Sequence, residues 1–326
     1  MTVRDQPPAQ GGRSAGERAT RRVLLLANAD KEDSVAETVA ELFDWLSDRV
    51  ETIQVETDGR DYCRRRAEGD EADRPAPDLL IVLGGDGALL GVVRAFADTT
   101  VPTLGVNFGR VGFLASTPAT RWKETLEAVL AGNGLLEPRM RVSAEWQANG
   151  EARRVLALND VVVQRAAHQG MLTCALRVGE DWVTNYRADG LIVATPSGST
   201  AYSLSAGGPI LLPSMEALVI TPICPQGLSN RPICLDPGSV LSLSVTQADG
   251  PTTLVIDGQE YRHLRRGDVV TIRRHPEAWP LYAMEGLDPY RRLRERLGWR
   301  GGIEPDVFAA ATPPEDRPDE GAGGVL

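Results

Sequence analysis

Histidine, cysteine and lysine are scarce in this sequence of 326 residues. The three histidines and four cysteines are scattered, with no Cys-x-x-Cys and no paired-histidine spacing, which excludes a structural zinc cluster or a zinc-hydrolase helix. Among 35 basic residues only two are lysine, Lys31 and Lys123. Because the sequence contains no Gly-Lys-Ser/Thr, the chain cannot form a Walker-type phosphate-binding loop.

Long apolar runs and an excess of positive charge are also missing. Runs such as Val23–Leu26 and Leu218–Ile220 are far too short to cross a membrane, and no apolar segment follows the polar N-terminus as a secretion signal requires. The net charge of −10 disfavours general electrostatic binding to nucleic acid or to anionic membranes. We therefore expect a cytoplasmic protein with free thiols and with neither nucleic acid nor membrane as partner.

The apolar content of 42% is enough for one large domain or two ordinary ones. Both ends of the chain are polar and rich in proline, glycine and charge, without apolar periodicity. Such composition cannot bury enough apolar surface to order a chain. We therefore predict a disordered arm at residues 1–20 and a disordered acidic tail at residues 303–326.

The first part of the chain alternates strand and helix patterns, which is typical of an open parallel sheet. Helices are expected from Asp33, where apolar residues recur with helical spacing, and at 88–96 and 120–130. The expected strands are 23–28, 52–55, 79–83 and 103–107. The pattern predicts an α/β domain over residues 21–130.

From residue 139 onward the pattern changes to many short strands separated by Gly and Asp turns. The predicted fold class is therefore α/β plus β, with a β-rich layered or sandwich domain at residues 131–285. A basic helix is expected at 289–297, and we predict that the segment 286–300 packs back and completes the first domain.

The sharpest local motif is the glycine turn Gly84–Gly87 (Gly-Gly-Asp-Gly), which directly follows a predicted strand. Glycines let a ligand approach the backbone closely, and the amides of the following helix favour anions. Asp86 could act as a base or hold Mg²⁺ against a phosphate chain. The structural alternative is an ordinary strand-to-helix turn in which Asp86 caps the helix.

A second motif, Asp189–Gly208, places hydroxyls and glycines behind a short apolar strand. It offers small donors and bare amides to an oxygen-rich ligand, although its composition also fits a flexible loop. A third, Leu158–Asp160, puts a polar pair into an apolar strand, where it must find partners. Val255–Gln259 is read most simply as a hairpin turn.

Together these residues resemble the NAD kinase family, which phosphorylates NAD to NADP. The resemblance spans about residues 22–300, and its most specific part is the block around Thr195–Tyr202 (Thr-Pro-Ser-Gly-Ser-Thr-Ala-Tyr). Its other matching segments are Gly84–Gly87, Leu104–Leu114, Leu158–Asp160, Ile220–Pro222, Asn230–Pro232 and Asp257–Gly258.

The resemblance implies that NAD lies between an N-terminal α/β domain and a C-terminal β domain. It implies that Asp86 activates the attacking hydroxyl and that Gly84, Gly85 and Lys31 serve the phosphate donor. It also implies a set of NAD-binding positions: Gly87, Phe113, Asn159, Asp160, Arg187, Asp189, Ser197, Thr200, Ala201, Tyr202, Ser205 and Asp257.

The resemblance further implies ATP or polyphosphate as phosphate donor and Mg²⁺ or another divalent cation as cofactor, with no direct ligation of the metal by protein. A homodimer or homotetramer is expected, since NAD sites in this family borrow residues from a neighbouring subunit. The chain departs from the family pattern at Ala88 (usually Thr), Asp160 (usually Glu) and Ser197 (usually Thr), and at Gln226-Gly227, where His often occurs.

Other functions remain open at this point. The glycine turn also occurs in phosphofructokinase-like and lipid kinases, although the acidic charge offers a lipid kinase no membrane-seeking surface. A dehydrogenase is disfavoured, because Leu26–Asp30 contains no glycine after the first strand. A non-catalytic NAD-binding regulator is the third alternative, suggested by Ala88 and Asp160.

Overall fold

A computed structural model describes residues 20–28, 33–69, 75–109, 112–148, 150–166, 170–284 and 289–299. Lys31, nearly all of the predicted N-terminal arm and the predicted acidic tail lie outside these ranges. The chain divides into two compact units, Met1–Leu287 and Asp288–Leu326.

The first sheet of the larger unit is mainly parallel. Within the described residues it has seven strands in the order β2-β1-β3-β4-β19-β6, with β5 paired to β4. β6 runs antiparallel to β19, while the other pairs are parallel. The strands are β1 (Arg22–Ala27), β2 (Thr52–Glu56), β3 (Leu79–Leu83), β4 (Thr103–Asn107), β5 (Thr117–Pro118), β6 (Leu135–Arg139) and β19 (Trp279–Ala283).

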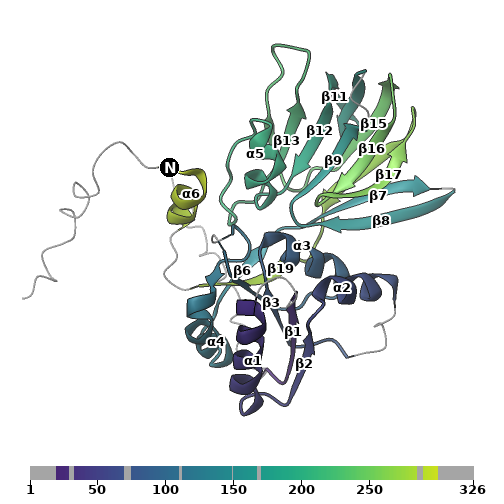
Figure 1. The fold of residues 1–326 in the computed structure, drawn as a ribbon. Coiled ribbons are helices and arrows are strands. Elements are labelled where there is room, and N and C mark those ends of the chain that lie inside the picture. Colours follow the sequence, from purple (N-terminus) through teal and green to yellow (C-terminus); the bar gives the residue numbers. More distant parts are fainter. Residues whose placement is uncertain are drawn as a thin grey trace, which may run out of the picture. The chain divides into compact units, whose positions relative to one another are not determined.

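Helices cover both faces of this sheet, because β1 and β3 are apolar on both sides. On one face, α1 (Asp33–Ser47) and α4 (Trp122–Leu130) pack on alternate residues of β1, β3 and β4. On the other, α2 (Gly59–Glu68) and α3 (Asp86–Ala95) pack on the intervening residues. Figure 1 shows the two helix pairs on opposite sides of the sheet.

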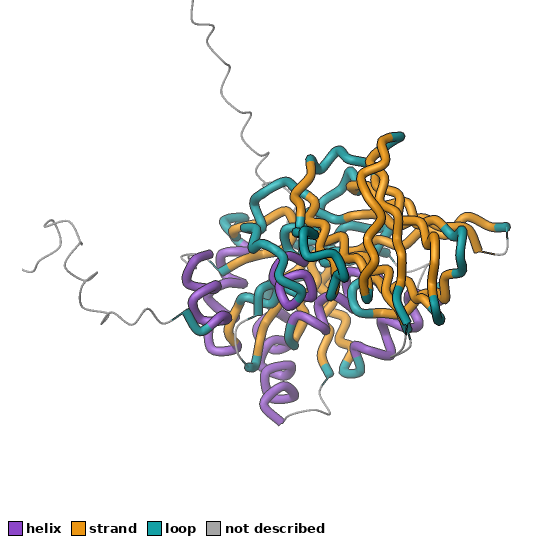
Figure 2. Tube along the Cα trace, turned by 90° about the horizontal axis from the view of Figure 1, so that it is seen from above, coloured by secondary structure: helices purple, strands orange, loops and turns teal. Residues whose placement is uncertain are grey.

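The rest of the larger unit is a sandwich of two antiparallel sheets. As far as the structure describes them, each has six strands, in the orders β11-β10-β15-β18-β7-β8 and β14-β13-β12-β9-β16-β17. In Figure 2 these strands gather on one side with little helix among them. The strands are β7 (Val142–Ala148), β8 (Glu151–Ala157), β9 (Asp160–Arg165), β10 (Leu172–Val178), β11 (Asp181–Ala188), β12 (Gly190–Ala194), β13 (Leu218–Ile223), β14 (Ile233–Leu235), β15 (Leu241–Ala248), β16 (Thr252–Ile256), β17 (Gln259–Leu264) and β18 (Val269–Arg274).

One apolar core lies between the two antiparallel sheets. Leu243 of one sheet belongs to the same buried cluster as Val161 and Val193 of the other, and alternation along each strand supplies the inward side chains. The outward face of the second sheet has its own small cluster around Ile192 and Leu211. The short helices η3 (Gly198–Thr200) and α5 (Tyr202–Ser205) lie in the connection from β12 to β13.

The predicted fold class is confirmed, since both the α/β part and the β-rich part are present. The first sheet nevertheless extends past the boundary drawn at residue 130, because β6 and β19 add to its β4 edge. The division into two domains stays a prediction, as does the packing of the C-terminal helix. That helix, α6 (Pro289–Leu297), belongs to the smaller unit.

Apolar contacts join the glycine-turn helix to the start of β9. Leu158 is fully buried in the same cluster as Leu89 of α3 and Leu114. Arg141, also fully buried, reaches back to the first part of the chain and donates to the carbonyl of Ala97 at 2.9 Å. Among the described helices none is long and apolar enough to span a bilayer.

Candidate functional site

Asp86 occupies the first helical position of α3, directly after the glycine turn. The residue before the helix, Gly85, is extended, and Asp86 does not cap its own helix. Its carboxylate instead accepts three backbone N–H groups, from Phe113 at 2.9 Å, Leu114 at 3.1 Å and Ala115 at 2.9 Å. The structural alternative of a simple helix cap is therefore wrong.

The Asp86 carboxylate stays available for chemistry despite these bonds. The residue is only half-buried, and an ionised carboxylate offers about four lone-pair sites, of which three are used here. The N-terminus of α3 attracts negative charge, which suits both this carboxylate and a phosphate beside it. Space is open around Gly85 and Gly87, since a Cβ at either would meet no atom within 4 Å.

Gly112 allows the 112–115 turn to reach this carboxylate. A Cβ at Gly112 would lie 1.9 Å from Oδ1 of Asp86, which no side chain can tolerate. The N–H of Gly112 also donates to the carbonyl of Ala115 at 3.0 Å, closing the turn. The glycine is thus required by a close approach, a role that its sequence neighbours gave no reason to assign.

A second aspartate organises the start of β9 in a similar way. Asp257 and Gly258 form the predicted hairpin turn between β16 and β17, both with positive φ (46° and 76°). The Asp257 carboxylate accepts the N–H of Leu158 at 2.8 Å, Asn159 at 2.8 Å and Asp160 at 3.0 Å. Burial raises the pKa of Asp257, and these backbone bonds oppose the rise.

Asp257 therefore fixes the backbone of Asn159 and Asp160. The side chains of both residues lie in surroundings that are unusual for polar groups. Burial, and then the neighbouring charge of Asp257, raises the pKa of Asp160 to about 7. The side-chain Oδ1 of Asn159 is buried without a hydrogen-bond partner. A buried acceptor without a donor costs free energy unless a ligand supplies one.

The Thr195–Tyr202 block is an ordered turn, not a flexible loop. The Thr195 hydroxyl donates to the Leu158 carbonyl at 2.6 Å and accepts the N–H of Gly198 at 3.1 Å. A Cβ at Gly198 would lie 2.0 Å from the backbone oxygen of Asn159. The block is therefore built directly against the Leu158–Asp160 segment.

The hydroxyls of this region divide into internal and available ones. Ser199 bonds to Pro196 and Leu211, and Ser203 bonds to Thr221, all inside the fold. Among the sequence-predicted positions, Thr200 donates to the Ser197 carbonyl at 3.1 Å. The remaining predicted side chains are Ser197, which is buried, Ala201, which is half-buried, and Tyr202 and Ser205, which are exposed.

Asp189 lies at the other end of the second sheet, and Arg187 precedes it on β11, an edge strand of the first antiparallel sheet. Asp160 pairs with Ala194 across β9 and β12, whereas Arg165 and Asp189 come at the opposite end of the same ladder. The side chain of Arg165 donates to both oxygens of Asp189, at 2.7 and 2.9 Å. Arg187 is exposed. The predicted block is thus split between two ends, and sequence reasoning missed Arg165, since a single arginine at a strand end forms no motif.

Tyr202 begins the short helix that follows the Thr195 turn. Its helix, α5, packs against β12. Partial burial raises the pKa of Tyr202, and the charges of Asp189 and Asp160 both add to the rise. Asp160 and Asp189 are separated by the length of β12.

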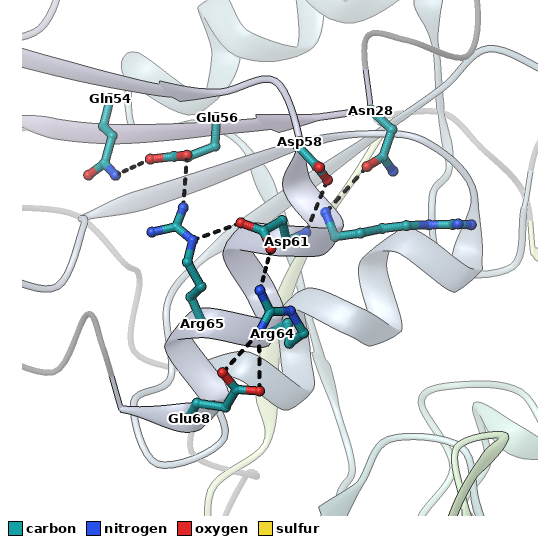
Figure 3. Close-up of polar contacts among 9 residues, drawn as sticks. Asn28, Gln54, Glu56, Asp58, Asp61, Arg64, Arg65 and Glu68 are labelled. Atoms are coloured by element: carbon teal, nitrogen blue, oxygen red, sulfur yellow. Dashed lines mark hydrogen bonds and ion pairs between the residues drawn. The ribbon is translucent and has the colours of Figure 1, made fainter.

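A polar cluster also follows β1 and β2, at the edge where open α/β sheets bind ligands. Asp58 caps α2 by accepting the N–H of Asp61 at 3.0 Å, and Arg65 contacts both Asp61 and Glu56 (Figure 3). Asn28 accepts the backbone N–H of Arg60 at 3.3 Å. These groups form hydrogen bonds and ion pairs with one another and hold α2 in place. Lys31, which was predicted to bind the phosphate donor, lies outside the described residues.

The structure therefore brings together two segments that the sequence singled out. Asn159, Asp160, Asp257 and the Thr195 turn are joined by hydrogen bonds, and Leu158 packs with Leu89 of the helix that begins at Asp86. Phe113 contributes its backbone N–H to Asp86. In the described ranges no group of three His, Cys, Asp or Glu side chains could hold a metal.

Family profiles match both parts of the chain. The profile of the ATP-NAD kinase N-terminal domain matches residues 23–134, and that of the ATP-NAD kinase C-terminal domain matches residues 158–284. These two matches cover the glycine turn, the Leu158–Asp160 segment, the Thr195 turn and Asp257. They therefore include every residue around which the site has been described.

Individual proteins are similar over most of their length. An NAD kinase of Syntrophotalea carbinolica is 36% identical over 282 residues, covering 86% of this chain and 99% of that protein. An NAD kinase of Nitrosomonas europaea is 42% identical over 228 residues, covering 70% of this chain and 77% of that protein.

Two solved structures are also similar. An Archaeoglobus fulgidus NAD kinase in complex with ATP aligns with a TM-score of 0.65 and 25% identity, over 85% of this chain and 97% of that one. Yeast NADH kinase complexed with NADH aligns with a TM-score of 0.76 and 23% identity, over 88% of this chain and 90% of that one, which speaks for the fold alone.

Proposed function

The chain belongs to the NAD kinase family, and we propose that it transfers the terminal phosphoryl group of ATP to the adenosine 2′-hydroxyl of NAD, forming NADP. It is accordingly a phosphotransferase with an alcohol acceptor. The observation that carries the proposal is the half-buried Asp86 carboxylate, fixed by three N–H groups beside an open glycine turn and next to the Leu158–Asp160 segment.

Asp86 acts as the general base in this proposal. Its unused lone pair accepts the proton of the 2′-hydroxyl while the new oxygen–phosphorus bond forms and the bond to ADP breaks in line. Because the three backbone donors hold the carboxylate still, little reorganisation is needed at the moment of reaction. The open amides at Gly85 and Gly87 line the path of the phosphate donor, with Gly84 and Lys31 as further donor residues.

The start of β9 binds the acceptor nucleotide. The buried Oδ1 of Asn159 needs a donor, and a ribose hydroxyl of NAD can supply one. Asp160 offers a carboxyl group in the same place, and Asp257 holds the backbone of both residues. The other predicted positions complete the proposed NAD site: Gly87, Phe113, Ser197, Thr200, Ala201, Tyr202, Ser205, Arg187 and Asp189.

Mg²⁺ fits this site if it binds together with the phosphate donor. Mg²⁺ keeps several waters and needs few protein ligands when phosphate oxygens are present. The open space at Gly85 and Gly87 leaves room for such a hydrated ion beside the phosphate chain. When bound, the ion neutralises charge on the phosphate chain, while this chain's own amides orient the donor.

The remaining expectations are part of the same proposal. Polyphosphate is an alternative donor, because the open glycine turn contacts phosphate through backbone amides and not through a base-specific group. We place the enzyme in the cytoplasm as a homodimer or homotetramer, without nucleic-acid or membrane partners. Exposed Trp182 and Val183 on the edge strand β11 support contact with a second copy.

The function is tested by incubating the purified protein with Mg²⁺, NAD and either ATP or polyphosphate and measuring NADP. We expect NADP with at least one donor and none from 2′-deoxy-NAD. Saturable NAD binding without any NADP would point to a regulator. Phosphorylation of a sugar or lipid with NAD ignored would point to a related kinase.

A further inference from the structure

Arg165 and Asp189 form the best-defined ion pair near the proposed NAD site. The guanidinium donates to both carboxylate oxygens at 2.7 and 2.9 Å, and the backbone N–H of Arg165 donates to the Asp189 carbonyl at 2.9 Å. The side chains are 27% and 30% exposed, so the pair is partly shielded from solvent and a ligand can still reach it. Bidentate geometry fixes the direction of the carboxylate as well as its charge.

The fixed carboxylate still has acceptor capacity. Each oxygen of an ionised carboxylate has two lone-pair sites, and Arg165 occupies one on each. The remaining sites suit an N–H or O–H donor from a ligand. A carbonyl or carboxylate in the same place would be repelled, so this position discriminates between closely similar groups.

The surface of β12 links this pair to the catalytic part of the chain. Asp160 and Asp189 lie at opposite ends of the ladder between β9 and β12, about 15–20 Å apart for five strand residues. An elongated ligand with its ribose near Asp160 is long enough to reach Asp189 at the other end of β12.

We propose that Arg165 is a positioning residue for the dinucleotide: it holds the Asp189 carboxylate so that the carboxylate accepts a hydrogen bond from an amino group at one end of NAD. This inference rests on the proposed function. NAD carries such a group at each end, the adenine amino group and the nicotinamide carboxamide. The role is the same for a dinucleotide held by this chain alone or shared with a second copy.

The test uses steady-state kinetics of the full chain and of Arg165→Met, with NAD, nicotinamide hypoxanthine dinucleotide and nicotinic acid adenine dinucleotide. The first analogue replaces the adenine amino group by a carbonyl, and the second replaces the carboxamide by a carboxylate. Without Arg165 the Asp189 carboxylate is no longer held in place to accept its hydrogen bond from NAD. We therefore expect Arg165→Met to raise the KM for NAD about tenfold, with kcat almost unchanged. The discrimination against one of the two analogues should fall by a similar factor.

A charge-swapped variant, Arg165→Asp with Asp189→Arg, separates positioning from simple stabilisation. It restores an ion pair, so its unfolding midpoint should return towards that of the wild type while its KM for NAD stays high. Arg165→Lys keeps the charge but loses the bidentate geometry, and should give an intermediate KM. Arg273→Met is the matched control, since Arg273 forms an exposed ion pair with Glu145 at 3.2 Å on the other sheet.

The proposal is overturned if Arg165→Met leaves the KM for NAD unchanged, or raises the KM of NAD and of both analogues by one common factor. It is also overturned if the charge swap restores the KM together with the stability. A wild-type enzyme that forms no NADP would instead refute the proposed function. The two failures are therefore distinguishable.

Discussion

Asp86 and Asp257 use the same device in two different parts of the molecule. Each sits beside a glycine in a tight turn, and each accepts three consecutive backbone N–H groups from a distant segment. Their surroundings differ. Asp86 starts a helix next to open space, whereas Asp257 lies between two strands with a positive φ and has a second carboxyl, Asp160, as neighbour.

The two carboxylates therefore differ in their access to a ligand and in the charge around them. The helix N-terminus and the open glycine turn leave Asp86 within reach of a ligand. Burial and a like charge instead raise the pKa of Asp160, and burial raises the pKa of Asp257. We therefore assign chemistry to the first turn and support to the second, an assignment that four substitutions can break or sharpen.

The largest effect is expected for Asp86→Asn. The amide cannot accept the proton of the 2′-hydroxyl, so kcat should fall by about 10²–10⁴-fold while the KM for NAD changes little. Asp78→Asn is the matched control. Asp78 directly precedes β3, at the other end of the strand from the glycine turn, and its carboxylate also accepts backbone N–H groups, from Arg21 and Arg22. Near-normal turnover of Asp86→Asn would show that the base has been assigned wrongly.

Next in size is the effect of Asp257→Ala on stability. The substitution leaves the N–H groups of Leu158, Asn159 and Asp160 without their acceptor, and we expect the free energy of unfolding to fall by about 3 kcal/mol. Asp257→Asn should lose less, since asparagine keeps an acceptor and tolerates positive φ. Urea unfolding measures both; equal losses for the two variants would contradict a capping role.

Asp160→Asn should change how stability depends on pH. Because the folded pKa of Asp160, about 7, lies above the ordinary value of 3.8, the native state binds the proton more tightly. This group therefore destabilises the wild type progressively as pH rises from about 4 to 7, by on the order of 1 kcal/mol per pH unit. The stability of the variant relative to wild type should rise over that interval and level off above it. Urea unfolding at a series of pH values checks this, and a constant difference would refute it.

The smallest effect is expected for Asp98→Ala. Asp98 pairs with Arg154 at 3.0 Å, but the two side chains are 83% and 51% exposed. Water and salt screen such a pair, so neither the unfolding midpoint nor kcat should change measurably. A loss comparable with that of Asp257→Ala would mean that exposed charge, and not backbone capping, holds these segments together.

Much of the fold could be predicted because apolar runs and turn residues that are close together in the sequence indicate its strands and turns. The apolar runs of β1, β3 and β4 and the Asp257–Gly258 hairpin were all predicted and are all present. Helix α2 was missed, because Tyr62 is its one large buried side chain and four of its ten residues are arginine. Strand β6 was missed as well, since it contains a glutamate and a proline, and the place of β19 in the first sheet could not be predicted, since its composition resembles that of the sandwich strands.

The predicted site was less complete than the predicted fold. The motifs directed attention to Asp86 and Asp257, but their partners are 27–29 and 97–99 residues away and carry no signature, since they are backbone N–H groups. Gly112 looks like any loop glycine until its contact with Asp86 is seen. Whether each predicted ligand residue touches NAD stays a prediction.

Local chemistry of the chain is enough to specify strands, tight turns and a helix that begins at a glycine-flanked aspartate, because φ preferences and apolar periodicity act between near neighbours. Packing of distant segments specifies the rest. It placed two aspartates against the N–H groups of other segments. Pairing of Asp189 with Arg165 likewise depends on strand register, which no short motif encodes.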